Sequence, residues 1–273
     1  MTAAEKNGSS LSFIHISDTH IGNSRDFSLY NHNTFERTRK LIELINGFCA
    51  PVDFVMNTGD VVNRPDTNAY QLVSELFSDL LHPVFFLPGN HDNPGETVSL
   101  SATYGFGFSE MENHSYQFSL NGCKFLTLNC TGSPRIDPHG EFTPVQERVL
   151  SQFLSHDEHL RPVLFIHFPA IATAIPWIDR EMLILNGERL HELLVRSGKI
   201  STVFFGHIHR RVSFIKDGIH YISAPSPVCQ FSLLPSDQKA SYESDIPLSF
   251  NYVTFCDGFV FIREITPGCG GMV

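Results

Sequence analysis

Several features that mark particular classes of protein are missing from this sequence. No apolar run approaches the ~20 residues of a membrane-spanning helix. The first ten residues are too polar to contain the apolar core of a signal peptide. Its six cysteines form no Cys-x-x-Cys pair and have no regular spacing, so we expect reduced thiols rather than a disulfide framework. These absences together predict a soluble protein of the cytoplasm that does not contact a membrane.

Clusters of positive charge are also missing. The chain carries 19 Lys and Arg against 29 Asp and Glu, which gives a formal net charge of -10. Its densest basic runs, 37–40 and 210–211, are short. A protein that binds nucleic-acid polymers without sequence preference needs clustered Lys and Arg for its phosphate contacts. We therefore expect no nucleic-acid polymer among its partners and a small molecule as its substrate.

The sequence does contain the material for one large core. Hydrophobic residues make up 42% of the 273 positions, and 24 positions are Phe. No repeat of fixed period and no Pro/Ser-rich linker divides the chain. We predict a single domain over residues 11–266, with a short disordered lead at 1–10 and a flexible tail at 267–273.

The first third of the chain alternates strands and helices. Apolar runs predict strands at 11–17, 53–57 and 84–87, and amphipathic segments predict helices at 34–48 and 67–81. Strand–helix–strand units form parallel sheets with right-handed crossovers. In such sheets ligands bind beyond the carboxyl ends of the strands.

The rest of the chain is richer in strands. An irregular, glycine-containing stretch at 93–112 predicts a loop. Three turn signals predict hairpins: Asn121-Gly122, Asp217-Gly218 and Asp257-Gly258. The remaining elements are predicted helices at 143–154 and 187–195 and predicted strands at 163–166 and 202–205. We expect an α/β fold with two β-layers, helices outside them, and inserts at 94–115 and 168–186.

Five apolar runs each end in residues that bind metals. The candidates are Asp18, His20, Asp60, Asn90, His167, His207 and His209. Carboxylate, imidazole and amide ligands without thiolate suit Mn, Fe, Co or Zn. On an extended segment, residues two apart project to the same side, so the pair Asp18 and His20 and the pair His207 and His209 would each hold one centre. Asp60, the carboxylate left over, is the natural bridge between two metals.

Two bridged metals predict phosphoryl chemistry. Such a pair clamps a phosphate for in-line displacement and lowers the pKa of a shared water, which gives a bridging hydroxide as the nucleophile. His91 directly follows the ligand Asn90 and is placed to contact the phosphate or protonate the leaving group. Asp92 is the candidate for orienting His91.

The ordered series of motifs resembles the calcineurin-like metallophosphoesterases. It runs Asp-x-His, Gly-Asp, Gly-Asn-His-Asp, His and Gly-His-x-His over residues 13–209. Any one of these residues alone would be an ordinary turn or packing residue, whereas the combined series is specific. Weaker cues, such as the segment 224–227, resemble the bacterial cyclic-nucleotide and glycerophosphodiester phosphodiesterases.

The resemblance implies a four-layer α/β/β/α sandwich and assigns roles to the candidates. It implies a first metal held by Asp18, His20, Asp60 and His209, and a second held by Asp60, Asn90, His167 and His207. It makes His91 the catalytic histidine and Asn63 a substrate contact. One motif departs from the family pattern, because Phe168 follows His167 where a second histidine is common. We expect Phe168 to give the substrate pocket an aromatic wall.

The predicted function is hydrolysis of a small phosphodiester of the cyclic-nucleotide or glycerophosphodiester type with two transition-metal ions. One alternative is a broad-specificity phosphomonoesterase of the same fold. A scaffold that has lost catalysis is disfavoured because every ligand position is filled, and a DNA nuclease is disfavoured by the acidic charge. The resemblance also suggests a homodimer or a higher homo-oligomer.

Overall fold

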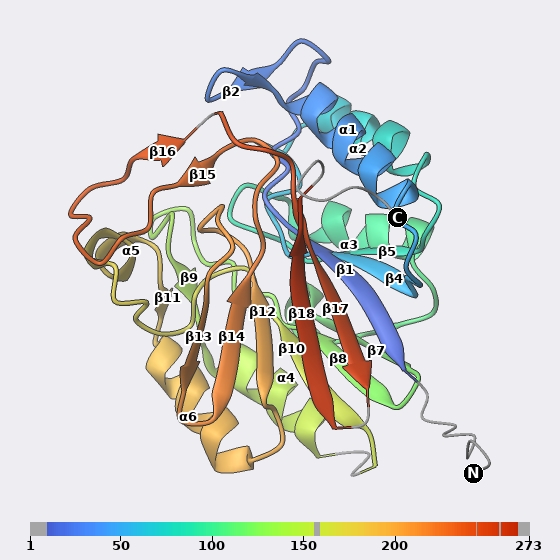
Figure 1. Ribbon diagram of the computed structural model, residues 1–273. Coiled ribbons are helices and arrows are strands. Elements are labelled where there is room, and N and C mark those ends of the chain that lie inside the picture. The colour runs from blue at the N-terminus through green and yellow to red at the C-terminus, as the bar shows by residue number, and fades with distance from the viewer. Residues whose placement is uncertain (1–9, 156–158, 244, 257, 267–273) are drawn as a thin grey trace, which may run out of the picture.

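Two β-sheets pack face to face at the centre of the molecule, and helices cover the outer face of each (Figure 1). The computed structural model describes residues 10–155, 159–243, 245–256 and 258–266. The predicted α/β fold with four layers is confirmed.

The first sheet has five strands in the order β18-β17-β1-β4-β5. Their bounds are Leu11–Ile16 (β1), Phe54–Asn57 (β4), Val84–Phe86 (β5), Phe250–Cys256 (β17) and Phe259–Ile265 (β18). Strands β1, β4 and β5 are parallel, and the C-terminal hairpin β17–β18 adds antiparallel strands beside β1.

The second sheet has seven strands in the order β13-β14-β12-β10-β8-β7-β6. Their bounds are Ser109–Glu110 (β6), Tyr116–Leu120 (β7), Cys123–Thr127 (β8), Arg161–Phe165 (β10), Thr202–Phe205 (β12), Ser213–Lys216 (β13) and Ile219–Ser223 (β14). The four central strands β8, β10, β12 and β14 are parallel. Three short pairs lie outside the sheets: Ser28–Leu29 (β2) with His32–Asn33 (β3), Gly140–Glu141 (β9) with Ile184–Leu185 (β11), and Gln230–Phe231 (β15) with Tyr242–Glu243 (β16).

Alternation along the strands assigns each side chain to a layer. In β1, Leu11 and Phe13 face the second sheet, whereas Ile14 and Ile16 face the outer helices. The space between the sheets is filled mainly by phenylalanine, and Phe13 stacks on Phe54 with ring centroids 4.9 Å apart. This aromatic core fixes the position of one sheet against the other, so the ends of their parallel strands meet at one edge.

Six α-helices and one 3-10 helix lie outside the sheets in the described residues. Their bounds are Thr34–Asn46 (α1), Thr67–Phe77 (α2), Pro94–Tyr104 (α3), Glu112–His114 (3-10), Pro144–Leu154 (α4), Pro176–Glu181 (α5) and Gly187–Ser197 (α6). Helices α1 and α2 cover the first sheet, and α4 and α6 cover the second. Helix α4 begins as predicted, with Thr143 as its N-cap and Pro144 in its first turn.

Two local predictions were wrong. The stretch 93–112 contains helix α3 instead of an unbroken loop: Asn93 caps it and Pro94 opens it, a start signal that Gly95 obscured. Helix α2, predicted to reach residue 81, is capped by Asp66 and already ends at Phe77. The predicted lead, apart from Ser10, the predicted tail and residue 257 of the last hairpin turn lie outside the described residues.

None of the helices in the described part of the chain combines the length and the apolar character that crossing a membrane requires.

Candidate metal centre

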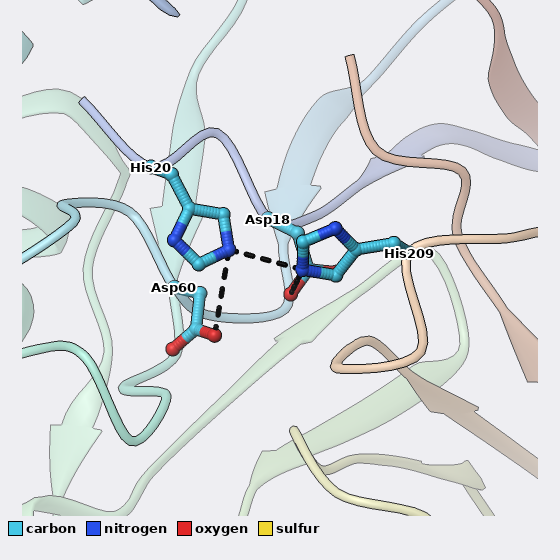
Figure 2. A group of neighbouring side chains, drawn as sticks. All are labelled: Asp18, His20, Asp60 and His209. Carbon is cyan, nitrogen blue, oxygen red and sulfur yellow. Dashed lines mark hydrogen bonds and ion pairs between the residues drawn. The ribbon is translucent and has the colours of Figure 1, made fainter. Parts of the chain in front are cut away.

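The candidate ligands lie on the loops that follow β1, β4, β5, β10 and β12, at the edge where these strands end. Asp18, His20, Asp60 and His209 form one group, in which one ligand atom of each lies within 4.8 Å of the others (Figure 2). All four are buried. The Nε2 atoms of His20 and His209 are 3.0 Å apart, and each lies 3.7 Å from a carboxylate oxygen, of Asp60 and Asp18 respectively.

A second group shares one carboxylate with the first. It consists of Asp60, His167 and His207. The Nε2 atom of His167 is 3.3 Å from Oδ2 of Asp60, the oxygen that also faces His20. Asn90 lies beside this group, because its neighbour His91 donates its backbone N–H to Oδ1 of Asp60 at 3.0 Å. The structure therefore brings all seven sequence candidates to one edge, with Asp60 common to both groups.

The backbone of the ligand loops is unusual. Asp18, His20, Asp60, His207 and His209 have φ of 57°, 45°, 52°, 68° and 55°. This left-handed region costs most non-glycine residues roughly 1–2 kcal/mol, and such residues cluster in turns and at functional sites. The expectation that the paired ligands lie on extended segments was therefore wrong, since β1 ends at Ile16 and β12 at Phe205.

The same backbone explains a second correction. His207 and His209 do not hold one centre together, because His209 joins the first group and His207 the second. The geometric argument from an extended pair fails here, whereas the family resemblance had implied that these two histidines belong to different centres.

Burial keeps three of the histidines in the form that binds metal. It lowers the pKa of His209 to about 3 and lowers the pKa values of His20 and His207 well below their ordinary range. A neutral imidazole offers a lone pair, which is what a cation needs. Burial also raises the pKa of Asp18 to about 7. A divalent cation in this place would favour the ionised carboxylate.

Asp60 and His167 form the most strongly interacting pair. Burial alone would raise the pKa of Asp60, but the neighbouring histidines, His167 foremost, hold it well below its ordinary value. Burial alone would lower the pKa of His167, but Asp60 raises it to about 9. His167 donates Nδ1–H to the carbonyl oxygen of Thr58 at 2.7 Å, so its Nε2 is the atom that faces Asp60.

Polar atoms without partners indicate that the site is built for a cation. Nε2 of His207 and Oδ1 of Asn90 are buried and have no hydrogen-bond partner among the described residues. Leaving such atoms unpaired costs about 1–3 kcal/mol each. Both are lone-pair donors, and the 3.0 Å approach of His20 and His209 brings two more nitrogens together. The residues present therefore fit bound divalent metal.

His91 lies beside the first ligand group. Its ring is half-buried and lies edge-on to His20, with centroids 4.8 Å apart. Its Nδ1 donates to the backbone carbonyl of Asn63 at 2.7 Å. Burial would lower the pKa of His91, but Asp60 and the Asn63 carbonyl raise it above its ordinary value. With Nδ1 held in this way, Nε2 is the nitrogen available for proton transfer.

Asp92 has a different contact from the one predicted. It does not orient the ring of His91, because its two oxygens accept the backbone N–H groups of Val61, Val62 and Gly89 at 2.9–3.1 Å. The carbonyl of Asn63 orients His91 instead. Asp92 therefore joins the loop after β4 to the loop after β5, which keeps Asp60 beside His91.

The two remaining predicted residues differ in exposure. Asn63 is half-buried beside His91, whereas Phe168 is fully buried. The ring of Phe168 packs edge-on against His167 and His207, with centroids 4.8 Å away in both cases. The structure thus places Phe168 behind two ligands, and contact of either residue with substrate stays a prediction.

Sequence reasoning missed the residues that hold the ligands from behind. Ser226 donates its hydroxyl to the carbonyl of Asp18 at 2.8 Å, and Cys229 lies 3.3 Å from Nδ1 of His209. Asp137 accepts from the amide of Asn90 at 2.9 Å. Ser226 falls in the segment 224–227, which the resemblance had marked, but nothing in the local sequence signals Cys229 or Asp137.

Comparison with known proteins agrees with this geometry. A protein of Vesicomyosocius okutanii named as a probable cyclic nucleotide phosphodiesterase is 26% identical over 258 residues, which cover 90% of this chain and 94% of that protein. A protein of Arcobacter nitrofigilis named as a probable glycerophosphodiester phosphodiesterase is 26% identical over 235 residues, covering 86% and 85%.

The fold is also found among solved structures. A dimetal phosphatase of Danio rerio superposes with a TM-score of 0.65 at 17% identity, covering 94% of this chain and 98% of that one. At this identity the likeness concerns the fold alone. The family pattern described as calcineurin-like phosphoesterase matches residues 11–211. The chain belongs to the calcineurin-like phosphoesterase family.

Proposed function

We propose that this protein hydrolyses small phosphodiesters, of the cyclic-nucleotide or glycerophosphodiester type, with two divalent transition-metal ions. The observation that carries the proposal is the position of Asp60, whose carboxylate is common to both ligand groups. A shared carboxylate is how two metal ions are held close enough to act on one phosphate. The names of the two similar proteins support the choice of substrate.

Each ion has its own set of residues in this proposal. Asp18, His20, Asp60 and His209 would hold the first, and Asp60, Asn90, His167 and His207 would hold the second. The ligand types are those that Mn, Fe, Co and Zn accept. When bound, the ions neutralise phosphate oxygens and lower the pKa of water that attacks phosphorus.

The protein's own contribution to the reaction lies in His91. Its Nδ1 is tied to the carbonyl of Asn63, so a proton on Nε2 can pass to the oxygen that leaves when the phosphoester bond breaks. The raised pKa of His91 favours the protonated form that this step needs. Asn63 would contact the substrate, and Phe168 would act on it through the two histidines against which its ring packs.

Three further aspects are part of the proposal. The catalytic domain would span residues 11–266, which include both sheets and all of the ligands. A location in the cytoplasm is consistent with the described cysteines, which are free thiols. Self-association into a homodimer or a higher oligomer remains a prediction.

Turnover of two chromogenic esters by protein reconstituted with Mn²⁺ tests the proposal. Bis(4-nitrophenyl) phosphate should be cleaved faster than 4-nitrophenyl phosphate. If the monoester is turned over far faster, the protein is a phosphomonoesterase of the same fold. A protein that cleaves neither ester and retains no metal would be a scaffold. A panel of cyclic nucleotides and glycerophosphodiesters then identifies the natural class.

A further inference from the structure

The loop 131–140 lies against the second ligand group and is firmly anchored. Thr131 and Gly140 form a β-bridge that closes the loop. Gly140 also begins β9, which pairs with β11, and Nδ1 of His139 is 3.0 Å from the carbonyl of Leu183. These contacts fix both ends of the loop, so its tip holds a defined position.

Asp137, near the tip of this loop, selects one orientation of Asn90. The amide nitrogen of Asn90 donates to Oδ1 of Asp137 at 2.9 Å. An ionised carboxylate can only accept hydrogen bonds, so the NH2 group of Asn90 must face it. The side-chain oxygen of Asn90 then points the other way, where it is buried and has no partner among the described residues. Without an acceptor oxygen at position 137, either orientation would be open to the amide of Asn90.

The next residue of the loop lies beside a second ligand. The backbone of Pro138 is near the ring of His207. Nε2 of His207 has no hydrogen-bond partner among the described residues. The loop therefore runs past two ligands of the same group and holds one of them, Asn90, by a side-chain hydrogen bond.

The loop also touches the residue behind these ligands. A Cβ atom on Gly140 would lie 2.5 Å from the ring of Phe168, so only glycine allows this approach. The ring of Phe168 packs in turn against His167 and His207.

The supports of the first group come from other parts of the chain. The backbone of Asp18 accepts from Ser226, and its carboxylate accepts the N–H of His207. His209 contacts Cys229. The loop 131–140 is thus placed to act on one metal and not on the other.

We propose that Asp137 is a positioning residue for the second metal: it turns Asn90 so that the side-chain oxygen, and not the amide nitrogen, is presented to the ion. This inference rests on the proposed function, because it requires two metal ions. It predicts that a substitution at a residue that touches neither ion can weaken one metal site and leave the other unchanged.

Mn²⁺ binding to the metal-free full-length protein tests the inference, measured by titration calorimetry and by electron paramagnetic resonance. Asp137→Ala should weaken the second site about 10–100-fold, the range for residues that orient metal ligands, and leave the first unchanged. Its spectrum should change from that of a coupled pair to that of a single ion. Asp137→Asn keeps an acceptor oxygen and should recover most of the affinity. Arg135→Ala, an exposed position in the same loop, is the matched control and should bind two ions normally.

The outcomes separate this inference from the proposed function. If the wild type binds two ions and cleaves the diester, but Asp137→Ala binds both ions as tightly, the positioning role is overturned and the function stands. Equal weakening of both sites, or no recovery with Asp137→Asn, also overturns it. A wild type with fewer than two sites overturns the proposed function and this inference together.

Discussion

The space between the sheets and the edge where the strands end are opposite kinds of environment, although the same strands build both. Between the sheets, Phe13, Phe54 and Phe204 are fully buried, apolar and on regular strands. At the edge, Asp18 and Asp60 are also buried but have acidic side chains and a left-handed backbone. Only four residues of β1 and its loop separate Phe13 from Asp18.

This difference indicates that stability and chemistry come from separate parts of the chain. Each buried phenylalanine contributes roughly 1.5–3 kcal/mol to folding. Each left-handed ligand costs roughly 1–2 kcal/mol, and the unpaired polar atoms cost more. Substitutions in one region should therefore leave the other largely intact, and four experiments test this expectation.

The largest effect is expected from Asp60→Asn, which removes the shared carboxylate. Turnover should fall on the order of 10⁴-fold, because several kcal/mol of charge stabilisation by the ions are lost. The free energy of unfolding of the metal-free protein should fall, because the ionised carboxylate and the protonated His167 stabilise each other in the folded state. The loss should be smaller than that from removing a core ring, since His167 can release its proton when Asp60 is neutral. Diester turnover and urea unfolding measure these two quantities, and metal analysis shows whether the ions are still bound. Asp79→Asn, an exposed acid, is the control. A loss of stability as large as that of Phe13→Ala would contradict the separation.

His91→Ala should lower turnover without changing metal content. Turnover should fall 10²–10⁴-fold, the usual contribution of a general acid. Metal content should stay the same, because the side chain of His91 holds no ion. His82→Ala, at a histidine outside both ligand groups, is the control. Turnover that matches the wild type would remove the proposed role of His91.

Phe13→Ala should produce the reverse pattern. Removing this fully buried ring, which stacks on Phe54, should lower the free energy of unfolding by about 3–5 kcal/mol. Metal content and turnover of the folded protein, measured well below the unfolding midpoint, should not change. If turnover falls with stability, core and edge are coupled after all.

The smallest expected effect is that of His15→Gln. His15 is buried between the sheets and lies 2.9 Å from the hydroxyl of Thr58. Burial lowers its pKa to about 3, whereas the unfolded chain has a value near 6.5, so the unfolded state binds the proton first. Its contribution to stability is complete above pH 6.5 and is lost as the pH falls towards 3.

Urea unfolding at pH 6.5 and 5.5 checks this prediction. The wild type should lose ~1 kcal/mol more than the variant between these two values. His82→Gln should behave like the wild type. If the wild type and His15→Gln lose the same free energy of unfolding between the two pH values, His15 is not held neutral in the folded state.

The accuracy of the predictions from sequence also differs between the core and the edge that carries the ligands. Buried strands and hairpin turns depend on local patterns, so β1, β12 and helix α4 were predicted closely. The ligands could be found because each follows an apolar run. The left-handed backbone at Asp18 and the distribution of His207 and His209 could not be read locally, since tertiary contacts impose them.

Supporting contacts were the least predictable. Asp92 was expected to orient its neighbour His91, but it binds backbone groups that lie about thirty residues earlier in the chain. Asp137 reaches Asn90 across 47 residues. Contacts of this kind depend on how loops from different strands meet, and residue type alone does not specify them.

The left-handed conformation of five ligands bears on how such a site persists through mutation. Glycine adopts this region at little cost, and asparagine tolerates it better than most residues. Replacement of Asp or His by glycine at positions 18, 20, 60, 207 or 209 would therefore remove a ligand and still allow the same loop conformation. A centre of this kind can lose its chemistry through single substitutions while the fold persists.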